Sequence, residues 1–147
     1  MHHPFIYKGL ESQESLESAL FSLLSTLFEE ATAENPYAVM LSGGSTPAGL
    51  YRRVAESGVR AGEGLYLLLS DERLVPRGSP DANLSLLSPM ADAIGLPADR
   101  LVVVDHDQGA QEAARRYNDA LTELNGRGIS RRVALLGVER VHESGDR

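Results

Sequence analysis

A glycine-rich segment, residues 42–47 (Ser-Gly-Gly-Ser-Thr-Pro), contains residue types that bind phosphate groups in many proteins. Glycines let the backbone approach a ligand closely and adopt positive φ, so successive amide N–H groups can point toward an anion. We expect Thr46 to cap a helix that begins at Pro47, and the amino end of a helix adds partial positive charge. A tight strand-to-helix turn with an ordinary cap would have the same composition. A phosphate group would fit against this segment.

A charged segment, residues 70–76 (Ser-Asp-Glu-Arg-Leu-Val-Pro), follows the next apolar stretch. An arginine placed directly after a strand can make a bidentate contact to phosphate, and each charge-assisted hydrogen bond contributes roughly 1.5–3 kcal/mol. In this segment Arg73 is that arginine, and Asp71 could accept a proton or hold a polar ligand. A surface cluster of ion pairs is the alternative explanation of these charges.

Several other catalytic classes are disfavoured. The chain has no cysteine, which excludes a thiol nucleophile and a Cys-ligated metal, and Lys8 is its single lysine. The G-x-x-x-x-G-K-[ST] phosphate loop and the G-x-S-x-G nucleophile turn are both absent. An ATP pyrophosphatase of the SGGxDS type is disfavoured because Thr46 stands at the aspartate position.

The elements that must position these loops alternate between strands and helices. Apolar residues recur at helical spacing over 12–33 and 110–124, and further helices are predicted from Pro47 and after Asn83, where Pro89 must begin, end or kink a helix. The predicted strands are 37–41, 65–69, 101–104 and 133–136. This order predicts an α/β fold with a doubly wound, mainly parallel sheet and helices on both faces. Ligands bind beyond the carboxyl ends of such strands.

Three segments carry a resemblance when they are taken together and in order. SGGSTPAGLY (42–51), SDERLVP (70–76) and PDANLSLL (80–87) resemble the 6-phosphogluconolactonase family, which shares its fold with the glucosamine-6-phosphate deaminases. The segments VVVDHDQGAQEAARRYNDAL and RRVALLGV are similar to later parts of the same family. Deaminases usually have D-E-Y where this chain has D-E-R, so the lactonase is favoured. The resemblance also implies a Rossmann-type sheet, incomplete at its C-terminus.

The resemblance implies hydrolysis of 6-phospho-glucono-1,5-lactone to 6-phosphogluconate in the pentose phosphate route. It implies that the 43–46 segment lines the sugar-phosphate site, that Arg73 binds anionic groups and that Asp71 orients substrate or water. Asn83 matches the asparagine of a Ser-Asn pair in the family, with Ala82 in place of the serine. No metal or organic cofactor is implied.

The family's acid/base is the histidine of GxDGHTAS, and this run is missing from the chain. His142 is the histidine nearest to the expected place; it stands five residues after Gly137, where the family's histidine stands six. His106 lies between two aspartates, but three adjacent residues rarely converge on one metal ion, and Asp107 is expected to cap the next helix. His142 therefore remains the candidate acid/base.

Length and charge bound the remaining possibilities. With 147 residues and a net charge of −7, the chain is predicted to be a single domain that does not bind nucleic acid, membrane or other polyanions. We expect a cytoplasmic protein whose partner is a small sugar phosphate. Residues 138–147 form an atypical tail, and we expect the chain to be the first part of a longer lactonase. A non-catalytic sugar-phosphate binding protein and a deaminase-like isomerase are the alternatives.

Overall fold

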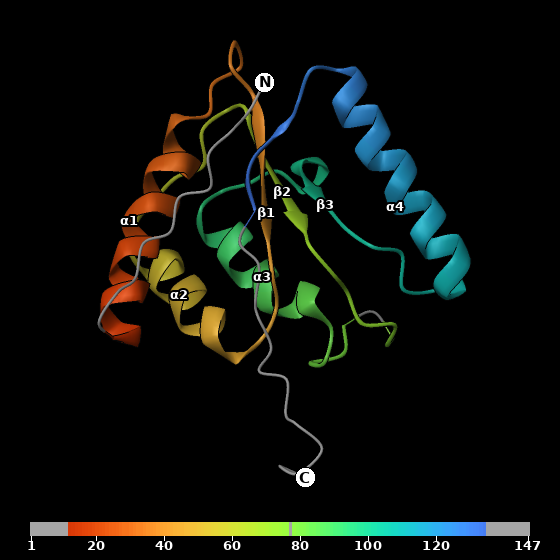
Figure 1. Ribbon diagram of the computed structural model, residues 1–147, viewed down its shortest axis with the longest axis horizontal. Helices are drawn as coiled ribbons and strands as arrows, with labels where there is room; N and C mark the ends of the chain where they lie inside the picture. Colours follow the sequence, from red (N-terminus) through yellow and green to blue (C-terminus); the bar gives the residue numbers. More distant parts are fainter. Residues whose placement is uncertain (1–11, 77, 135–147) are drawn as a thin grey trace, which may run out of the picture.

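The computed structural model describes residues 12–76 and 78–134 (Figure 1). Strands and helices alternate in it as the sequence predicts, and a short 3₁₀ turn, Ala98–Arg100, precedes the third strand. The helices are α1 (Gln13–Glu30), α2 (Ser45–Glu56), α3 (Asn83–Ala93) and α4 (Gly109–Gly126). The strands are β1 (Tyr37–Leu41), β2 (Leu65–Leu69), β3 (Leu101–Val102) and β4 (Arg131–Ala134). None of these helices is both long enough and apolar enough to span a lipid bilayer.

The four strands form one sheet in the order β3-β2-β1-β4, and every pairing is parallel. The predicted α/β fold with a parallel sheet is therefore confirmed. β1 and β2 pair without irregularity from Tyr37↔Leu65 to Leu41↔Leu69, and all ten of their residues are buried. Complete burial explains why both strands are continuous apolar runs: each has a covered face on either side.

Helices cover both faces of the sheet (Figure 1). Alternate strand residues such as Val39 and Leu67 pack against α1, α2 and α3, which lie together on one face. The intervening residues, such as Met40 and Leu68, pack against α4, which covers the other face through Leu124. Because side chains alternate along a strand, this division separates the interior into two apolar clusters.

The start of α2 differs from the prediction. The helix begins at Ser45 rather than at Pro47, and its N-cap residue is Gly44, with φ of 112°. Gly44 turns the chain into the helix through a left-handed conformation that favours glycine, so the helix begins two residues earlier than expected. Thr46 lies within the first turn, and the prediction that it is the helix cap was wrong.

The start of α4 also differs. Gln108 occupies its N-cap position, no side chain caps the helix, and the predicted cap by Asp107 was wrong. The reason is local: the amide of Asp107 donates a 3.0 Å hydrogen bond to Oδ1 of Asp105, which folds the loop before the helix begins. α1, in contrast, is capped by Ser12, whose Oγ accepts a hydrogen bond from the amide of Ser15 at 3.1 Å.

The bounds of two strands differ from the prediction, because pairing with neighbouring strands determines where they begin and end. β3 is confined to Leu101–Val102 instead of 101–104, because its pairing with β2 ends at Leu68↔Val102. β4 begins at Arg131, two residues before the predicted start, because Arg131 already pairs with Ala38 of β1. Residues 135–136 of the predicted strand lie outside the described residues. Pro89 lies inside α3, so it neither begins nor ends that helix.

Two neighbouring leucines of α1 test the packing of this helix against the sheet. Leu24 is 1% exposed, whereas Leu23 is 44% exposed. We expect Leu24→Ala to lower the free energy of unfolding by about 2–5 kcal/mol, because it leaves a cavity in the core, whereas Leu23→Ala should change it by less than ~0.5 kcal/mol. Urea denaturation followed by circular dichroism measures both values. Equal effects of the two variants would contradict the placement of α1.

Candidate functional site

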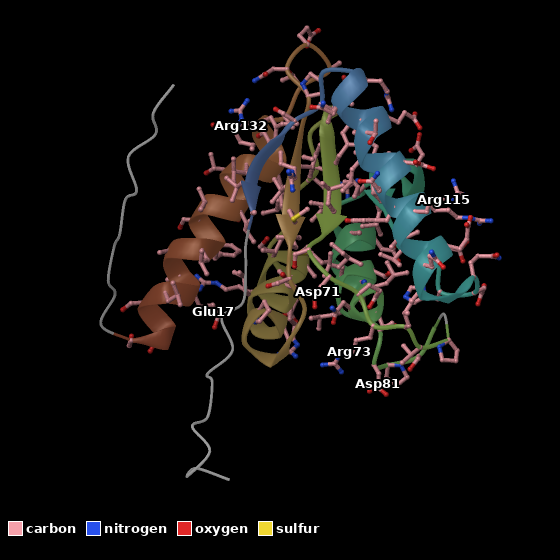
Figure 2. All side chains as sticks on the ribbon, turned by 45° about the vertical axis from the view of Figure 1, so that its right-hand side comes forward. Glu17, Asp71, Arg73, Asp81, Arg115 and Arg132 are labelled. Atoms are coloured by element: carbon pink, nitrogen blue, oxygen red, sulfur yellow. The ribbon has the colours of Figure 1, made fainter. Side chains whose placement is uncertain are left out.

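The loops predicted to carry function lie together at the carboxyl edge of the sheet. Figure 2 shows Asp71, Arg73 and Asp81 at this edge and Arg132 at the opposite one. The β1–α2 loop, the β2–α3 loop and the β3–α4 loop all leave the sheet here, as parallel strands with helical crossovers require. The structure therefore brings Asp71, Arg73 and the glycine-rich segment to one edge.

Gly43 and Asn83 join the first two loops. A Cβ atom on Gly43 would lie 2.0 Å from Oδ1 of Asn83, so no larger residue fits at position 43 while Asn83 keeps its place. The Nδ2 of Asn83 donates a 3.0 Å hydrogen bond to the carbonyl oxygen of Asp71, and the residue is 8% exposed. Asn83 thus holds the two loops together, and its predicted contact with substrate stays a prediction.

Glu72 organises the second loop. Ala82, at the N-cap position of α3, has no side chain that could satisfy the first amides of the helix. The Glu72 carboxylate accepts these amides instead: Oε1 from Asn83 at 2.6 Å and Oε2 from Leu84 at 2.9 Å. Oε1 also accepts the amide of Arg73 at 2.7 Å. One carboxylate therefore fixes both the start of α3 and the backbone of Arg73.

A histidine from the third loop approaches the same carboxylate. Nε2 of His106 lies 3.0 Å from Oε2 of Glu72, and the two side chains are 0% and 1% exposed. The approach is close but not aligned as a hydrogen bond. Burial acts to raise the pKa of Glu72, but the hydrogen bonds from the amides of Arg73, Asn83 and Leu84 and the contact with His106 outweigh it and lower the pKa below its ordinary value.

The side chains of Asp71 and Arg73 remain open to solvent. Oδ1 of Asp71 accepts a 3.1 Å hydrogen bond from Oγ of Ser70, which leaves the rest of this carboxylate accessible. The guanidinium of Arg73 makes no ion pair with the described part of the chain, although its backbone is fixed by Glu72. An exposed cation on a fixed backbone suits the binding of an external anion.

The amino ends of α2 and α3 differ in their ability to bind an anion. The first amides of α3 already donate to a carboxylate, whereas the N-cap residue of α2, Gly44, has no side chain that could accept the first amides of that helix. The backbone amides that follow Gly44 lie at a helix end, which carries a partial positive charge. The predicted contributions of Gly44, Ser45 and Thr46 to ligand binding stay predictions. We expect an anion at α2 rather than at α3.

Two tyrosines, one buried and one half-buried, donate hydrogen bonds to the backbone at the carboxyl ends of β1 and β2. The hydroxyl of Tyr51 donates to the carbonyl oxygen of Ser42 at 2.6 Å, and that of Tyr117 donates to the carbonyl oxygen of Leu69. Burial raises the pKa of both hydroxyls, that of Tyr117 to about 12. Both tyrosines therefore stay protonated at neutral pH and anchor the last residues of the strands.

Sequence reasoning missed Glu72 and His106 as parts of the site. Glu72 could have been found, because a helix whose N-cap is Ala82 needs a carboxylate or hydroxyl from elsewhere. No sequence signal indicates that His106 is buried against Glu72, since this contact joins two loops that are distant in sequence. The predicted acid/base, His142, and the whole 138–147 tail lie outside the described residues.

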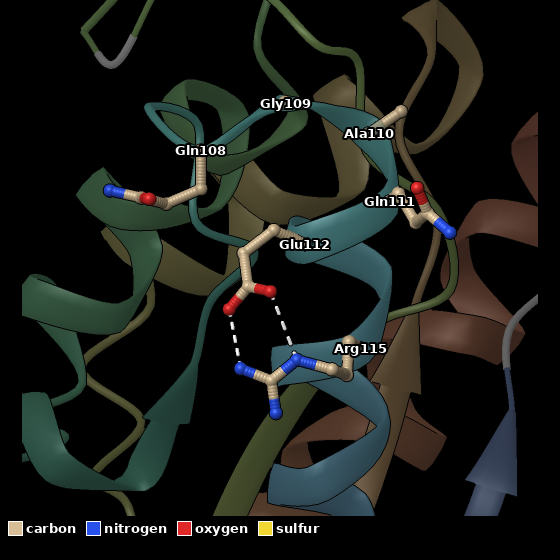
Figure 3. Close-up of a pocket in the computed structure, with 6 residues that line it drawn as sticks. All are labelled: Gln108, Gly109, Ala110, Gln111, Glu112 and Arg115. Carbon is tan, nitrogen blue, oxygen red and sulfur yellow. Dashed lines mark hydrogen bonds and ion pairs between the residues drawn. The ribbon is translucent and has the colours of Figure 1, made fainter.

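Other surface features do not add to the site. A hollow of about 610 Å³ lies over the first turns of α4, where Arg115 is held by Glu112 (Figure 3). It is lined by this one helix and the residue before it, and its charges neutralise one another. Within residues 12–76 and 78–134, no three carboxylate or imidazole side chains gather in a way that could hold a metal ion.

The fold and the edge define the class of protein: a parallel α/β protein with a candidate anion site at the carboxyl ends of β1 and β2. The family model for glucosamine-6-phosphate isomerases/6-phosphogluconolactonase matches residues 11–138, and the chain belongs to this family. A search of the curated proteins found no match.

Solved structures are similar to this chain over about half of their own length. A 6-phosphogluconolactonase from Plasmodium vivax is 17% identical with a TM-score of 0.74, over 88% of this chain and 46% of that one. One from Thermotoga maritima is 23% identical with a TM-score of 0.62, over 88% and 58%. One from Trypanosoma cruzi is 25% identical with a TM-score of 0.63, over 85% and 53%. These likenesses support the fold that the family match indicates.

Glu72→Gln tests the capping of α3 by this carboxylate. The amide nitrogen of glutamine cannot accept the N–H groups that Glu72 accepts, so we expect the free energy of unfolding at pH 7 to fall by about 1–3 kcal/mol. Because the folded-state pKa of Glu72 is lowered from 4.5, its contribution is present above that pH and is lost as the pH falls through the folded value. The variant should therefore lose less stability than the wild type on acidification below pH 4.5.

Urea denaturation between pH 7 and pH 3 measures both effects. Glu34→Gln is the matched control, because Glu34 is exposed in the turn before β1, and its stability should stay within about 0.5 kcal/mol of the wild type. If Glu72→Gln lost as much stability on acidification as the wild type, the carboxylate would not be the cap.

Proposed function

We propose that the carboxyl edge binds a hexose acid 6-phosphate and its lactone, and that the function is of the 6-phosphogluconolactonase type. The observation that carries the proposal is an amino end of α2 whose N-cap residue, Gly44, has no side chain, beside a loop that holds an exposed arginine on a fixed backbone. The family match over 11–138 supports the choice of a sugar phosphate as the anion. The D-E-R sequence at 71–73 favours the lactonase over the deaminase branch.

The proposed substrate suits the charges at this edge. The chain as a whole carries a net charge of −7, so an anionic ligand needs local positive groups. The amides after Gly44 would take one anionic group, and Arg73 would take the other through charge-assisted hydrogen bonds. The two sites match a ligand that is anionic or strongly polar at both ends, as a 6-phosphorylated sugar acid is.

Hydrolysis of the lactone is a simple ester reaction. The oxygen of a water molecule bonds to the carbonyl carbon, the bond from that carbon to the ring oxygen breaks, and a proton passes from the water to the ring oxygen. The requirements are a held substrate, an oriented water, a proton acceptor and a donor for the developing oxyanion. Asp71 would orient water or substrate, and Arg73 would hold the anionic group. His142 stays the predicted acid/base.

Arg73→Ala tests the proposed ligand. Calorimetry should detect saturable binding of 6-phosphogluconate by the wild type, and the variant should bind about 10- to 100-fold more weakly, because it lacks a charge-assisted contact of roughly 1.5–3 kcal/mol. Arg132→Ala is the matched control, since this exposed arginine lies at the opposite edge of the sheet (Figure 2). Absence of binding, or equal losses in the two variants, would contradict the proposal.

Turnover separates an enzyme from a binding protein. Hydrolysis of the lactone produces a carboxylic acid, so titration of released protons at constant pH measures the rate. We expect slow hydrolysis by this chain, because the sequence after Gly137 lacks the D-G-H-T-A-S run that places the family's histidine. Rapid hydrolysis abolished by His142→Ala would show that His142 is the acid/base. Binding of 6-phosphogluconate without any turnover would favour the non-catalytic alternative.

A further inference from the structure

His106 is a buried polar residue that the proposed reaction does not use. Its imidazole is fully buried, and within the described residues its Nδ1 atom has no hydrogen-bond partner. Its one close polar contact is the 3.0 Å approach of Nε2 to Oε2 of Glu72. A buried polar group with so few partners costs stability, so its presence calls for a compensating role.

The contact with Glu72 determines which nitrogen of His106 carries hydrogen. The Glu72 carboxylate is ionised at neutral pH, because its pKa is lowered, and it can only accept hydrogen bonds. An unprotonated Nε2 would place two lone pairs against each other at 3.0 Å. Nε2 therefore carries a hydrogen, which faces the Glu72 carboxylate.

The loop that carries His106 is itself anchored. The carboxylate of Asp105 accepts the amide of Asp107 at 3.0 Å and a guanidinium nitrogen of Arg116 in α4 at 2.7 Å. His106 lies between these two aspartates. The loop that places it against Glu72 is therefore attached to α4. The contact joins α4 to the start of α3, two helices that cover opposite faces of the sheet.

We propose that His106 is a positioning residue that acts through Glu72 on the candidate sugar-phosphate site. Glu72 holds the amides of Arg73, Asn83 and Leu84, and Asn83 in turn packs on Gly43. A Glu72 side chain without His106 loses its contact from the third loop and is free to shift, and the backbone of Arg73 shifts with it. The effect on ligand binding rests on the proposed function, whereas the effect on the loop positions does not.

Two substitutions at position 106 separate positioning from packing. His106→Gln keeps an N–H donor near the place of Nε2, and His106→Leu keeps the volume without a donor. We expect calorimetry with 6-phosphogluconate to give an affinity about 10-fold weaker for His106→Leu and within ~3-fold of the wild type for His106→Gln. Glu123→Gln, a change in an exposed ion pair with Arg127 near the end of α4, should leave the affinity unchanged.

All affinities are measured at a temperature where urea titrations show each variant to be fully folded. Under these conditions a purely structural role of His106 would lower the denaturation midpoint and leave the affinity of the folded protein unaltered. That result would overturn the proposal. Equal weakening by His106→Leu and His106→Gln would overturn it as well, because the donor would then be irrelevant.

Amide spectra test the positioning without any ligand. In ¹H–¹⁵N spectra of His106→Leu, we expect the resonances of Arg73, Asn83, Leu84 and Gly43 to shift, with smaller shifts in His106→Gln. A long-range ¹H–¹⁵N spectrum of the wild type should show hydrogen on Nε2. Shifts confined to residues 105–108 would overturn the proposal. If His106→Leu does not fold, His106→Asn replaces it, since its amide is too short to contact Glu72.

The two proposals fail in distinguishable ways. If the wild type does not bind 6-phosphogluconate but the amide shifts spread to Arg73 and Gly43, the proposed function is wrong and the positioning role stands. If the wild type binds 6-phosphogluconate and His106→Leu binds it equally well with local shifts only, the proposed function stands and His106 is a packing residue.

Discussion

The arrangement of the carboxyl edge depends on one buried carboxylate, that of Glu72. A helix that begins with Ala82 and Asn83 exposes amides that need acceptors, and Glu72 supplies both of its oxygens to them. Burial of a carboxylate is unfavourable unless several donors surround it, and here three amides donate to it and an imidazole lies against it. One of the donors that stabilise the Glu72 carboxylate is the amide of Arg73, so the same hydrogen bond also fixes the loop that carries Arg73.

The three residues of the D-E-R segment (71–73) differ in their surroundings. The side chain of Glu72 is buried and all its contacts are with the protein itself. Its neighbours Asp71 and Arg73 are exposed to solvent. The amino ends of the helices divide in the same way. The amino end of α3 donates to the Glu72 carboxylate, whereas the N-cap residue of α2 is a glycine, which has no side chain. Under the proposed function, an anion would bind at the amino end of α2 rather than at that of α3, and this choice would restrict how a sugar phosphate can lie.

The sequence predicts those features that depend on local pattern and fails where distant contacts decide. β1 and β2 were placed correctly, because a strand buried on both faces is a continuous apolar run with clear ends. Thr46 and Asp107 were wrongly predicted as caps, since glycine conformation and an internal hydrogen bond of the loop, respectively, override cap preference. The contacts among Gly43, Asn83, Glu72 and His106 join three loops and have no periodic signature. Motif similarity indicated segments that meet at this edge of the sheet, but it gave no role to Glu72 or His106.

The order of strands in the sheet has a consequence for how the chain folds. β1 pairs on one side with β2, the next strand along the chain, and on the other with β4, the last described strand. The entropy lost on closing a loop grows with its length, so the β1–α2–β2 pairing costs less to form than the pairing of Ala38 with Arg131. Gly43, Glu72 and Asn83 all belong to the segment from β1 to α3, whose ends are brought together by these shorter closures. Chain topology thus favours the assembly of these three residues before β4 pairs with β1.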